Sequence, residues 1–151
     1  MTKKFTSLGL MSGTSGDGVD ASLIKTDGNL KYEAIKDKYY EYDEEIFQKF
    51  HSIKEKINKF EDIKLHKNEI NYLEKEITLF HANVIKKFSD KHDFGIVGVH
   101  GQTIYHSPTE KVSLQLINVK LLAQLTKKKI VFNFRERDLK NGGEGAPLTP
   151  I

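Results

Sequence analysis

The chain contains no cysteine, so disulfide bonds, thiolate metal ligands and cysteine nucleophiles are all excluded. It also has no apolar run approaching the ~20 residues that a membrane-spanning helix requires. The first residues, Met1 to Lys4, run directly into a short apolar stretch and lack the features of a signal peptide. We therefore expect a cytoplasmic location and no membrane partner.

A large excess of one charge is absent as well. The 24 basic residues are interspersed with 21 acidic ones, which gives a net charge of +3. This small excess does not favour nucleic acid as a partner. With 151 residues, of which 38% are hydrophobic, the chain is long enough for one domain with a buried core.

Strand-like patterns dominate the first forty residues. Phe5–Met11 and Val19–Thr26 flank a glycine-rich loop, and Leu30–Tyr40 follows the turn signal Asp27-Gly28-Asn29. These runs predict a meander of three antiparallel strands.

From Asp43 onward the apolar residues step by three and four, which predicts helices over residues 43–60 and 63–91. Strands and helices then alternate. Strands are expected at 96–99, 112–117 and 129–134, a helix at 118–126, and a loop over 135–151. This order indicates an α/β fold, with a mixed sheet and helices packed against it.

The loop between the first two strands consists of glycine, hydroxyl residues and aspartate, in the run Gly13-Thr14-Ser15-Gly16-Asp17-Gly18-Val19-Asp20. Exposed backbone N–H groups and Ser/Thr hydroxyls can cradle phosphate, and Asp17 or Asp20 can hold a phosphate-bound Mg²⁺. The run is not a P-loop, because no lysine follows the glycines and the next segment is strand-like. An ordinary hairpin turn is the alternative interpretation.

A second polar stretch, His100-Gly101-Gln102-Thr103, offers a ring nitrogen, an amide and a hydroxyl beside a glycine. These groups suit hydrogen bonding to a polyhydroxylated ligand. The alternative is a turn at a strand end whose side chains satisfy the local backbone. His100 and His106 lack further ligands that would complete a zinc site.

The densest polar stretch is Phe134 to Pro147, which contains Arg135, Arg137, Asp138 and several glycines. A carboxylate that arginine keeps ionised can act as a general base, and arginine also neutralises phosphate or carboxylate on a ligand. A solvated charge cluster is the alternative. Since ligands of open α/β sheets sit at the carboxyl ends of strands, the three polar loops are expected to converge.

Together these stretches resemble the anhydro-N-acetylmuramic acid kinase family. The resemblance covers essentially all 151 residues and is weakest from Asp43 to Phe94. The matching segments are Gly9 to Ser15 with Asp17 to Asp20, His100 to Thr103 with His106 and Pro108, Leu114 to Leu116, and Phe134-Arg135 with Asp138 and Gly142 to Leu148.

The resemblance implies an RNase H-like lobe of the actin-like, sugar kinase and Hsp70 ATPase architecture. It also implies an enzyme that uses ATP and Mg²⁺ to open 1,6-anhydro-N-acetylmuramic acid and to phosphorylate O6, as in peptidoglycan recycling. By motif match, Gly13 to Asp20 would bind the ATP phosphates, and Asp138 would be the catalytic base. His100, Gln102, Thr103 and Arg135 would contact the sugar.

Family members are more than twice as long as this chain, so residues 1–151 are expected to form an incomplete amino-terminal lobe. The resemblance implies a second lobe, which a separately encoded polypeptide could provide, and this lobe would supply most of the adenosine pocket. An inactive remnant, or a sugar- or phosphate-binding module, is the alternative. Family members commonly carry Leu or Met at the position of Gly16, which predicts a looser loop here. Ile117-Asn118 replaces a usual Gly-Asp, which leaves any helix capping to Asn118.

Overall fold

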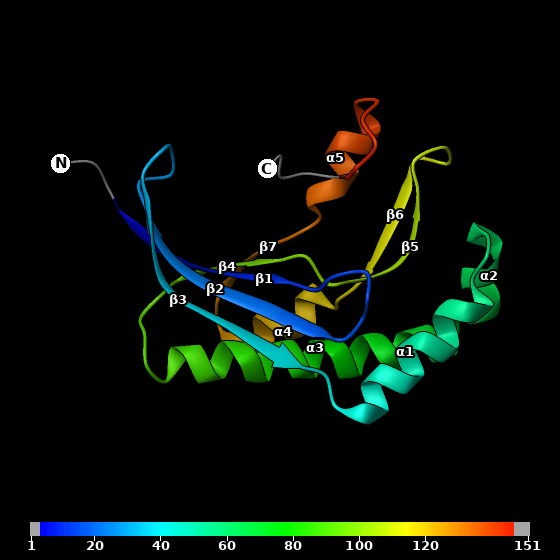
Figure 1. Ribbon diagram of the computed structural model, residues 1–151, viewed down its shortest axis with the longest axis horizontal. Coiled ribbons are helices and arrows are strands. Elements are labelled where there is room, and N and C mark those ends of the chain that lie inside the picture. The colour runs from blue at the N-terminus through cyan, green and yellow to red at the C-terminus, as the bar shows by residue number, and fades with distance from the viewer. Residues whose placement is uncertain (1–3, 147–151) are drawn as a thin grey trace.

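The computed structural model describes residues 4–146, which form a five-stranded sheet with a two-stranded hairpin beside it (Figure 1). The order in the larger sheet is β3-β2-β1-β4-β7. Its strands are β1 (Phe5–Met11), β2 (Gly18–Thr26), β3 (Tyr32–Glu41), β4 (Ile96–Val99) and β7 (Lys129–Val131). The hairpin consists of β5 (Gln102–Ser107) and β6 (Val112–Leu116). The helices are α1 (Glu44–Lys56), α2 (Phe60–Leu65), α3 (Lys67–Ser89), α4 (Val119–Thr126) and α5 (Phe134–Lys140).

The central strand β1 is antiparallel to β2 and parallel to β4. Its Leu8 is in register with Leu23 of β2 and with Val97 of β4. β3 extends the antiparallel half of the sheet, and β7 extends the parallel half. The predicted meander and the predicted α/β class with a mixed sheet are confirmed. The arrangement is consistent with an RNase H-like lobe of the sugar kinase ATPase architecture.

Alternation along the strands gives the sheet one buried and one accessible face. Leu8, Leu10, Val97 and Val99 point into the core and are nearly or completely buried. Met11, on the opposite face, is 44% exposed. Figure 1 shows α1, α3 and α4 on the core side of the sheet and α5 on the other side. The helices therefore build the core from one side only.

The first helix begins at a cap that the sequence supplies. The side chain of Asp43 accepts a hydrogen bond from the backbone N–H of Ile46 at 2.9 Å. Ile46, Phe50 and Ile53 form its buried stripe. The helix ends at Lys56, so the prediction of one helix over residues 43–60 is too long.

The chain turns between α1 and α2 because the Asp62 carboxylate binds backbone N–H groups that precede it. Its Oδ2 accepts hydrogen bonds from the N–H groups of Asn58 at 2.9 Å and Lys59 at 3.0 Å. α2 therefore starts separately, and α3 begins four residues later than the predicted second helix. Among residues 4–146, no helix is both long and apolar enough to span a bilayer.

α4 depends on Asn118 for its cap. The Oδ1 of Asn118 accepts from the N–H of Leu121 at 3.0 Å, as its sequence position predicts. The backbone N–H of Asn118 donates to the hydroxyl of Thr78 in α3 at 2.9 Å. An asparagine therefore satisfies the helix end at this position.

The segment after β7 differs most from the prediction. The strand expected over 129–134 ends at Val131, and Asn133 has a positive φ of 63°. The segment expected to be a loop contains α5, which is anchored by the buried Leu139. The end of the glycine-rich motif, from Pro147 onward, lies outside the described residues.

Candidate functional site

Two polar loops and the start of α5 meet at one edge of the sheet, because β1, β4 and β7 run parallel and end there. The backbone N–H of His100 donates to the carbonyl oxygen of Leu10 at 3.0 Å. The side-chain amide of Gln102 donates to the carbonyl oxygen of Gly13 at 2.7 Å. Arg135 donates from Nε to Nε2 of His100 at 2.8 Å. The predicted convergence is therefore confirmed.

The loop after β1 is held by its own polar groups. The N–H of Gly16 donates to the carbonyl of Gly13 at 3.3 Å, and the Ser15 hydroxyl donates to Oδ1 of Asp17 at 2.7 Å. The N–H of Tyr42 donates to the carbonyl of Asp17 at 2.9 Å. The Ser15 hydrogen bond is the main reason that the pKa of Asp17 is lowered. This exposed carboxylate is therefore ionised at neutral pH and can act as a cation ligand.

Two glycines in this loop are sterically required. Gly16 has a φ of 71°, and a Cβ there would lie only 2.0 Å from Cε1 of Phe50. A Cβ on Gly18 would lie 2.4 Å from the carbonyl oxygen of Tyr40. The expected loosening at Gly16 is not found, because the ring of Phe50 fills the space beside it.

The last residues of the predicted phosphate loop belong to β2. Val19 is completely buried in the core, so no part of it is exposed to a ligand in this structure. Asp20 lies on the accessible face and borders a hollow of about 740 Å³ together with Met11 and Arg135. Within residues 4–146 the Asp20 carboxylate forms no hydrogen bond or ion pair. It is therefore available to a cation or a ligand.

A buried chain of hydrogen bonds fixes Ser12 beneath the loop. His81 of α3 is fully buried, and its Nδ1 donates to the carbonyl of Ile77 at 2.8 Å. Its Nε2 is then unprotonated and lies 3.5 Å from Oγ of Ser12. The Tyr42 hydroxyl lies 3.2 Å from the same Oγ. If Tyr42 donates to Ser12 and Ser12 donates to Nε2 of His81, all three groups have a hydrogen-bond partner. Burial lowers the pKa of His81 to about 4, which keeps the ring neutral.

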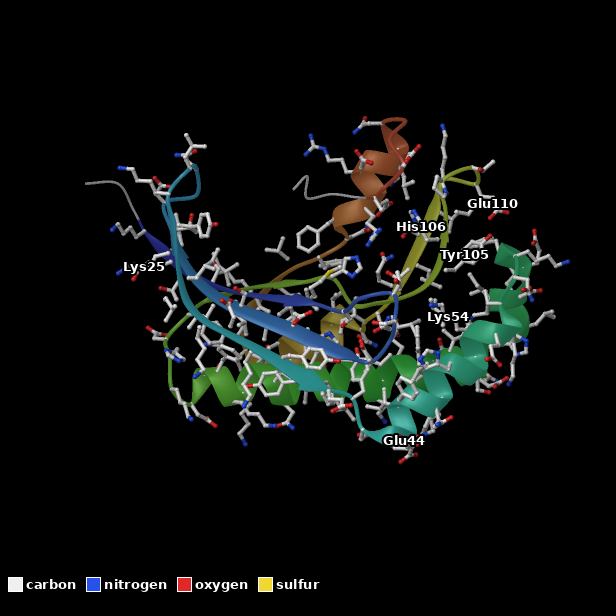
Figure 2. The ribbon with its side chains drawn as sticks, in the orientation of Figure 1. Lys25, Glu44, Lys54, Tyr105, His106 and Glu110 are labelled. Carbon is white, nitrogen blue, oxygen red and sulfur yellow. The ribbon has the colours of Figure 1, made fainter. Side chains whose placement is uncertain are left out.

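A lysine reaches the loop from α1. The Nζ of Lys54 donates to the carbonyl oxygen of Thr14 at 2.7 Å (Figure 2). Sequence reasoning missed Lys54 because 40 residues separate it from the loop. His81 carried a weak signal, since it lies four residues from both Ile77 and Ile85 in the buried stripe of α3.

The His100–Thr103 segment positions other groups and exposes little of its own. The Nδ1 of His100 donates to the carbonyl of Gly101 at 2.8 Å, and its Nε2 accepts from Arg135, so both nitrogens are used. Burial, with the Arg135 charge, lowers the pKa of His100. Gln102 and Thr103 begin β5 and are 0% and 6% exposed. Gln102 also has a buried Oε1 without a hydrogen-bond partner.

Arg135 and Asp138 both bind the glycine-rich segment that follows α5. Nη1 of Arg135 donates to the carbonyl of Gly145 at 3.1 Å, and Oδ2 of Asp138 accepts from the N–H of Gly145 at 2.8 Å. In the described part of the chain neither Arg135 nor Arg137 forms an ion pair with Asp138. The backbone, rather than an arginine, therefore orients this exposed carboxylate.

Metal-ligating side chains are sparse among the described residues. No group of three or more His, Asp or Glu side chains is placed to hold an ion in residues 4–146. Asp17 and Asp20 are two separate carboxylates at the loop. Such a pair suits an ion that also takes oxygen ligands from phosphates and water.

Comparisons with known proteins agree with the motif pattern. The family model described as anhydro-N-acetylmuramic acid kinase matches residues 5–151. A relative of that name from Pelagibacter ubique is 52% identical over 100% of this chain and 41% of its own length. Relatives of the same name from Agrobacterium fabrum and Gluconobacter oxydans are 35% and 37% identical, over 96% and 95% of this chain and 40% of their own lengths. The chain thus spans about 40% of the length of these curated relatives. It belongs to the anhydro-N-acetylmuramic acid kinase family.

Proposed function

We propose that this chain supplies the amino-terminal lobe of an ATP-dependent kinase. The kinase would open 1,6-anhydro-N-acetylmuramic acid by hydrolysis and phosphorylate O6, which yields N-acetylmuramic acid 6-phosphate. The observation that carries this proposal is the meeting of three motif segments at the shared end of β1, β4 and β7. The relatives of this chain carry the name anhydro-N-acetylmuramic acid kinase, and we therefore propose the same reaction for it.

ATP would bind through its phosphates at residues 13–20. The backbone N–H groups of this loop and the hydroxyls of Thr14 and Ser15 suit phosphate oxygens. Asp17 and Asp20 would hold the Mg²⁺ that neutralises the phosphates, and the free Asp20 carboxylate fits this role. Because ATP is a cytoplasmic metabolite, we place the protein in the cytoplasm.

Asp138 would act as the general base. It would take a proton from the water that attacks the anomeric carbon, as the bond from that carbon to O6 breaks. The released O6 would then attack the γ-phosphorus, and ADP would leave. The Gly145 N–H bond to Oδ2 supports this role, because it orients the carboxylate, while Oδ1 has no hydrogen-bond partner among residues 4–146.

Kinases with this architecture work by closing a cleft and excluding water. We propose that a second lobe, in the same polypeptide or separately encoded, completes the site of this chain. The alternative is an inactive remnant, or a module that binds sugar or phosphate without turnover.

A coupled assay of ATP consumption on 1,6-anhydro-N-acetylmuramic acid tests the proposal. The 151-residue chain is assayed alone and then mixed with the remaining, carboxy-terminal part of the Pelagibacter ubique relative. Turnover in the mixture is expected. Its absence from both samples, with the chain folded by circular dichroism, would favour the remnant.

A further inference from the structure

The helix α1 carries three lysines, and one of them differs from the other two in its partner. Lys49 forms ion pairs with two glutamates, and Lys56 forms an ion pair with one. Lys54 forms no ion pair in residues 4–146, and its Nζ donates instead to the carbonyl oxygen of Thr14 at 2.7 Å. The charge of Lys54 therefore lies at the glycine-rich loop without an ion-pair partner.

A neighbouring aromatic ring holds this lysine in place. Phe50 lies one helical turn before Lys54, and its completely buried ring fills the space beside Gly16. The Nζ of Lys54 lies 5.3 Å from the centroid of the same ring, at a distance that allows a cation–π interaction. Figure 2 shows Lys54 beside the loop that its Nζ contacts. Helix α1 thus holds the glycine-rich loop through an apolar contact at Gly16 and a charged donor at Thr14.

The Lys54 hydrogen bond determines which way one peptide group of the loop points. The carbonyl of Thr14 and the N–H of Ser15 belong to the same planar trans peptide, so they point in opposite directions. Since Lys54 binds the carbonyl, the N–H of Ser15 is directed away from Nζ. The bond from Gln102 to the carbonyl of Gly13 orients the N–H of Thr14 in the same way.

Both of these N–H groups are open to a ligand. Thr14 and Ser15 are exposed, and neither backbone N–H has a hydrogen-bond partner in the part of the chain that the structure describes. Adjacent unpaired N–H groups of this kind bind anions. The carbonyl oxygens that would repel an anion are occupied by donors from α1 and from the start of β5.

The peptide that Lys54 binds is the one that can reverse within its turn. The N–H of Gly16 donates to the carbonyl of Gly13, so Thr14 and Ser15 are the central residues of a β-turn. Reversal of the peptide between them would give a turn that needs a positive φ at Ser15. Ser15 is not among the described residues with a positive φ, so the structure shows the other orientation. The Lys54 bond stabilises this orientation.

We propose that Lys54 is a positioning residue for nucleotide phosphate binding. Its hydrogen bond keeps the N–H of Ser15 directed toward a phosphate oxygen, and its unpaired charge increases the attraction of the loop for a triphosphate. Lys54 acts through the loop and does not contact the reacting atoms. This inference rests on the proposed function, and it assigns a role in ATP binding to a helix outside the three motif segments.

Two substitutions of Lys54 test this role in the chain mixed with the carboxy-terminal part of the relative, the complemented enzyme. Lys54→Met removes the donor and the charge but keeps the apolar stem, so we expect KM for ATP to rise about tenfold while KM for the sugar is unchanged. Lys54→Arg keeps the charge and the donors and should restore KM for ATP to within about threefold of the wild type. Lys56→Met makes the same change on the same helix, away from the loop, and should leave both KM values unchanged.

Anion binding to the 151-residue chain gives a readout that does not depend on turnover. In a titration with inorganic triphosphate followed by NMR, the backbone amide signals of Thr14 and Ser15 should shift in the wild type and in Lys56→Met. In Lys54→Met the apparent Kd for triphosphate should be about tenfold higher.

The outcomes separate this inference from the function on which it rests. A wild-type KM for ATP and a wild-type Kd for triphosphate in Lys54→Met would overturn the role of Lys54 while the proposed function stands. An equal rise of KM in Lys56→Met, or an equal rise of KM for the sugar, would also overturn it, because the effect would then be general. If the wild type neither binds triphosphate nor turns over in the mixture, the proposed function fails and this inference falls with it.

Discussion

The side-chain amide of Gln102 binds the carbonyl oxygen of Gly13 at 2.7 Å, across 89 residues of sequence. Gln102 is completely buried and Gly13 is half-buried, so this bond is largely removed from water. It joins the first residue of β5 to the glycine-rich loop after β1. The β5–β6 hairpin and the glycine-rich loop are therefore coupled directly.

Replacing Gln102 by Met should loosen this coupling. The variant keeps the volume but removes the donor, so the Gly13 carbonyl loses its buried partner. We expect KM for ATP to rise about tenfold in the complemented enzyme, the equivalent of one lost hydrogen bond. Gln48→Met, which removes an exposed amide contact to Glu44, is the control. Equal KM values in the two variants would contradict the coupling.

Gly16→Ala should destabilise the lobe strongly. A methyl group there meets the ring of Phe50 and also forces alanine to a φ of 71°. We expect a loss of about 2–4 kcal/mol in the free energy of unfolding, which combines overpacking with backbone strain. Gly28→Ala is a matched control, since Gly28 has a φ of 80° with no atom within 4 Å of its Cβ position.

Urea denaturation would measure the free energy of unfolding of both glycine variants. The control should lose only about 1–2 kcal/mol, from strain alone. In a Phe50→Ala background, the loss of unfolding free energy caused by Gly16→Ala should decrease toward the loss caused by Gly28→Ala. A cost that does not depend on Phe50 would show that the ring contact is unimportant.

Acid should weaken the fold through His81. Its pKa is about 4 in the folded protein against an ordinary value of 6.5, so below pH 6.5 the unfolded chain binds the extra proton. Its contribution to stability is complete above pH 6.5 and declines as the pH falls toward 4. Between pH 7.5 and 5.0 we expect a loss of about 2 kcal/mol from this residue.

The same denaturation measurements on His81→Gln separate the contribution of His81 from that of the other titrating groups. This variant should be less stable at pH 7.5 but should lose about 2 kcal/mol less on acidification. If both proteins lose the same free energy between the two pH values, His81 is not the titrating group.

Asp138→Asn should nearly abolish turnover by the complemented enzyme. Asparagine can still accept the hydrogen bond from Gly145, but it cannot take a proton, so we expect a decrease in kcat of about 10²–10⁴-fold with sugar affinity retained. Asp138→Ala, which also loses the Gly145 contact, should weaken sugar affinity as well. Wild-type turnover in Asp138→Asn would eliminate this residue as the base.

Local patterns were sufficient for most of the fold. Alternation predicted β1 and β2, and three- and four-residue steps predicted the buried faces of α1 and α3. α5 was missed because glycines and charges surround it, and its only fully buried anchor is Leu139. The break between the first two predicted helices was placed after residue 60 instead of after Lys56, and α2 was missed, because both depend on Asp62 accepting hydrogen bonds from the backbone N–H groups of Asn58 and Lys59.

The position of the candidate site could be predicted from the sequence, but its side-chain contacts could be predicted only in part. The parallel strands bring the three motif segments together, as their positions after strands suggested. The inward orientation of His100 and Gln102 follows from contacts with Arg135 and Gly13 that no local pattern reveals. The roles of Lys54 and Tyr42 likewise arise from helix and strand packing across the chain.

The mixed pairing of β1 has a consequence for the order of folding. Its antiparallel partner β2 follows after a short turn, so the β1–β2–β3 meander has low contact order and can form early. Its parallel partner β4 begins only after all of α1, α2 and α3, so pairing Ser7 with Ile96 requires closure of a loop of about 90 residues. The bond from Gln102 to Gly13 forms only after that closure. The glycine-rich loop is therefore expected to reach its final geometry late, and partly folded chains should retain the meander without a working site.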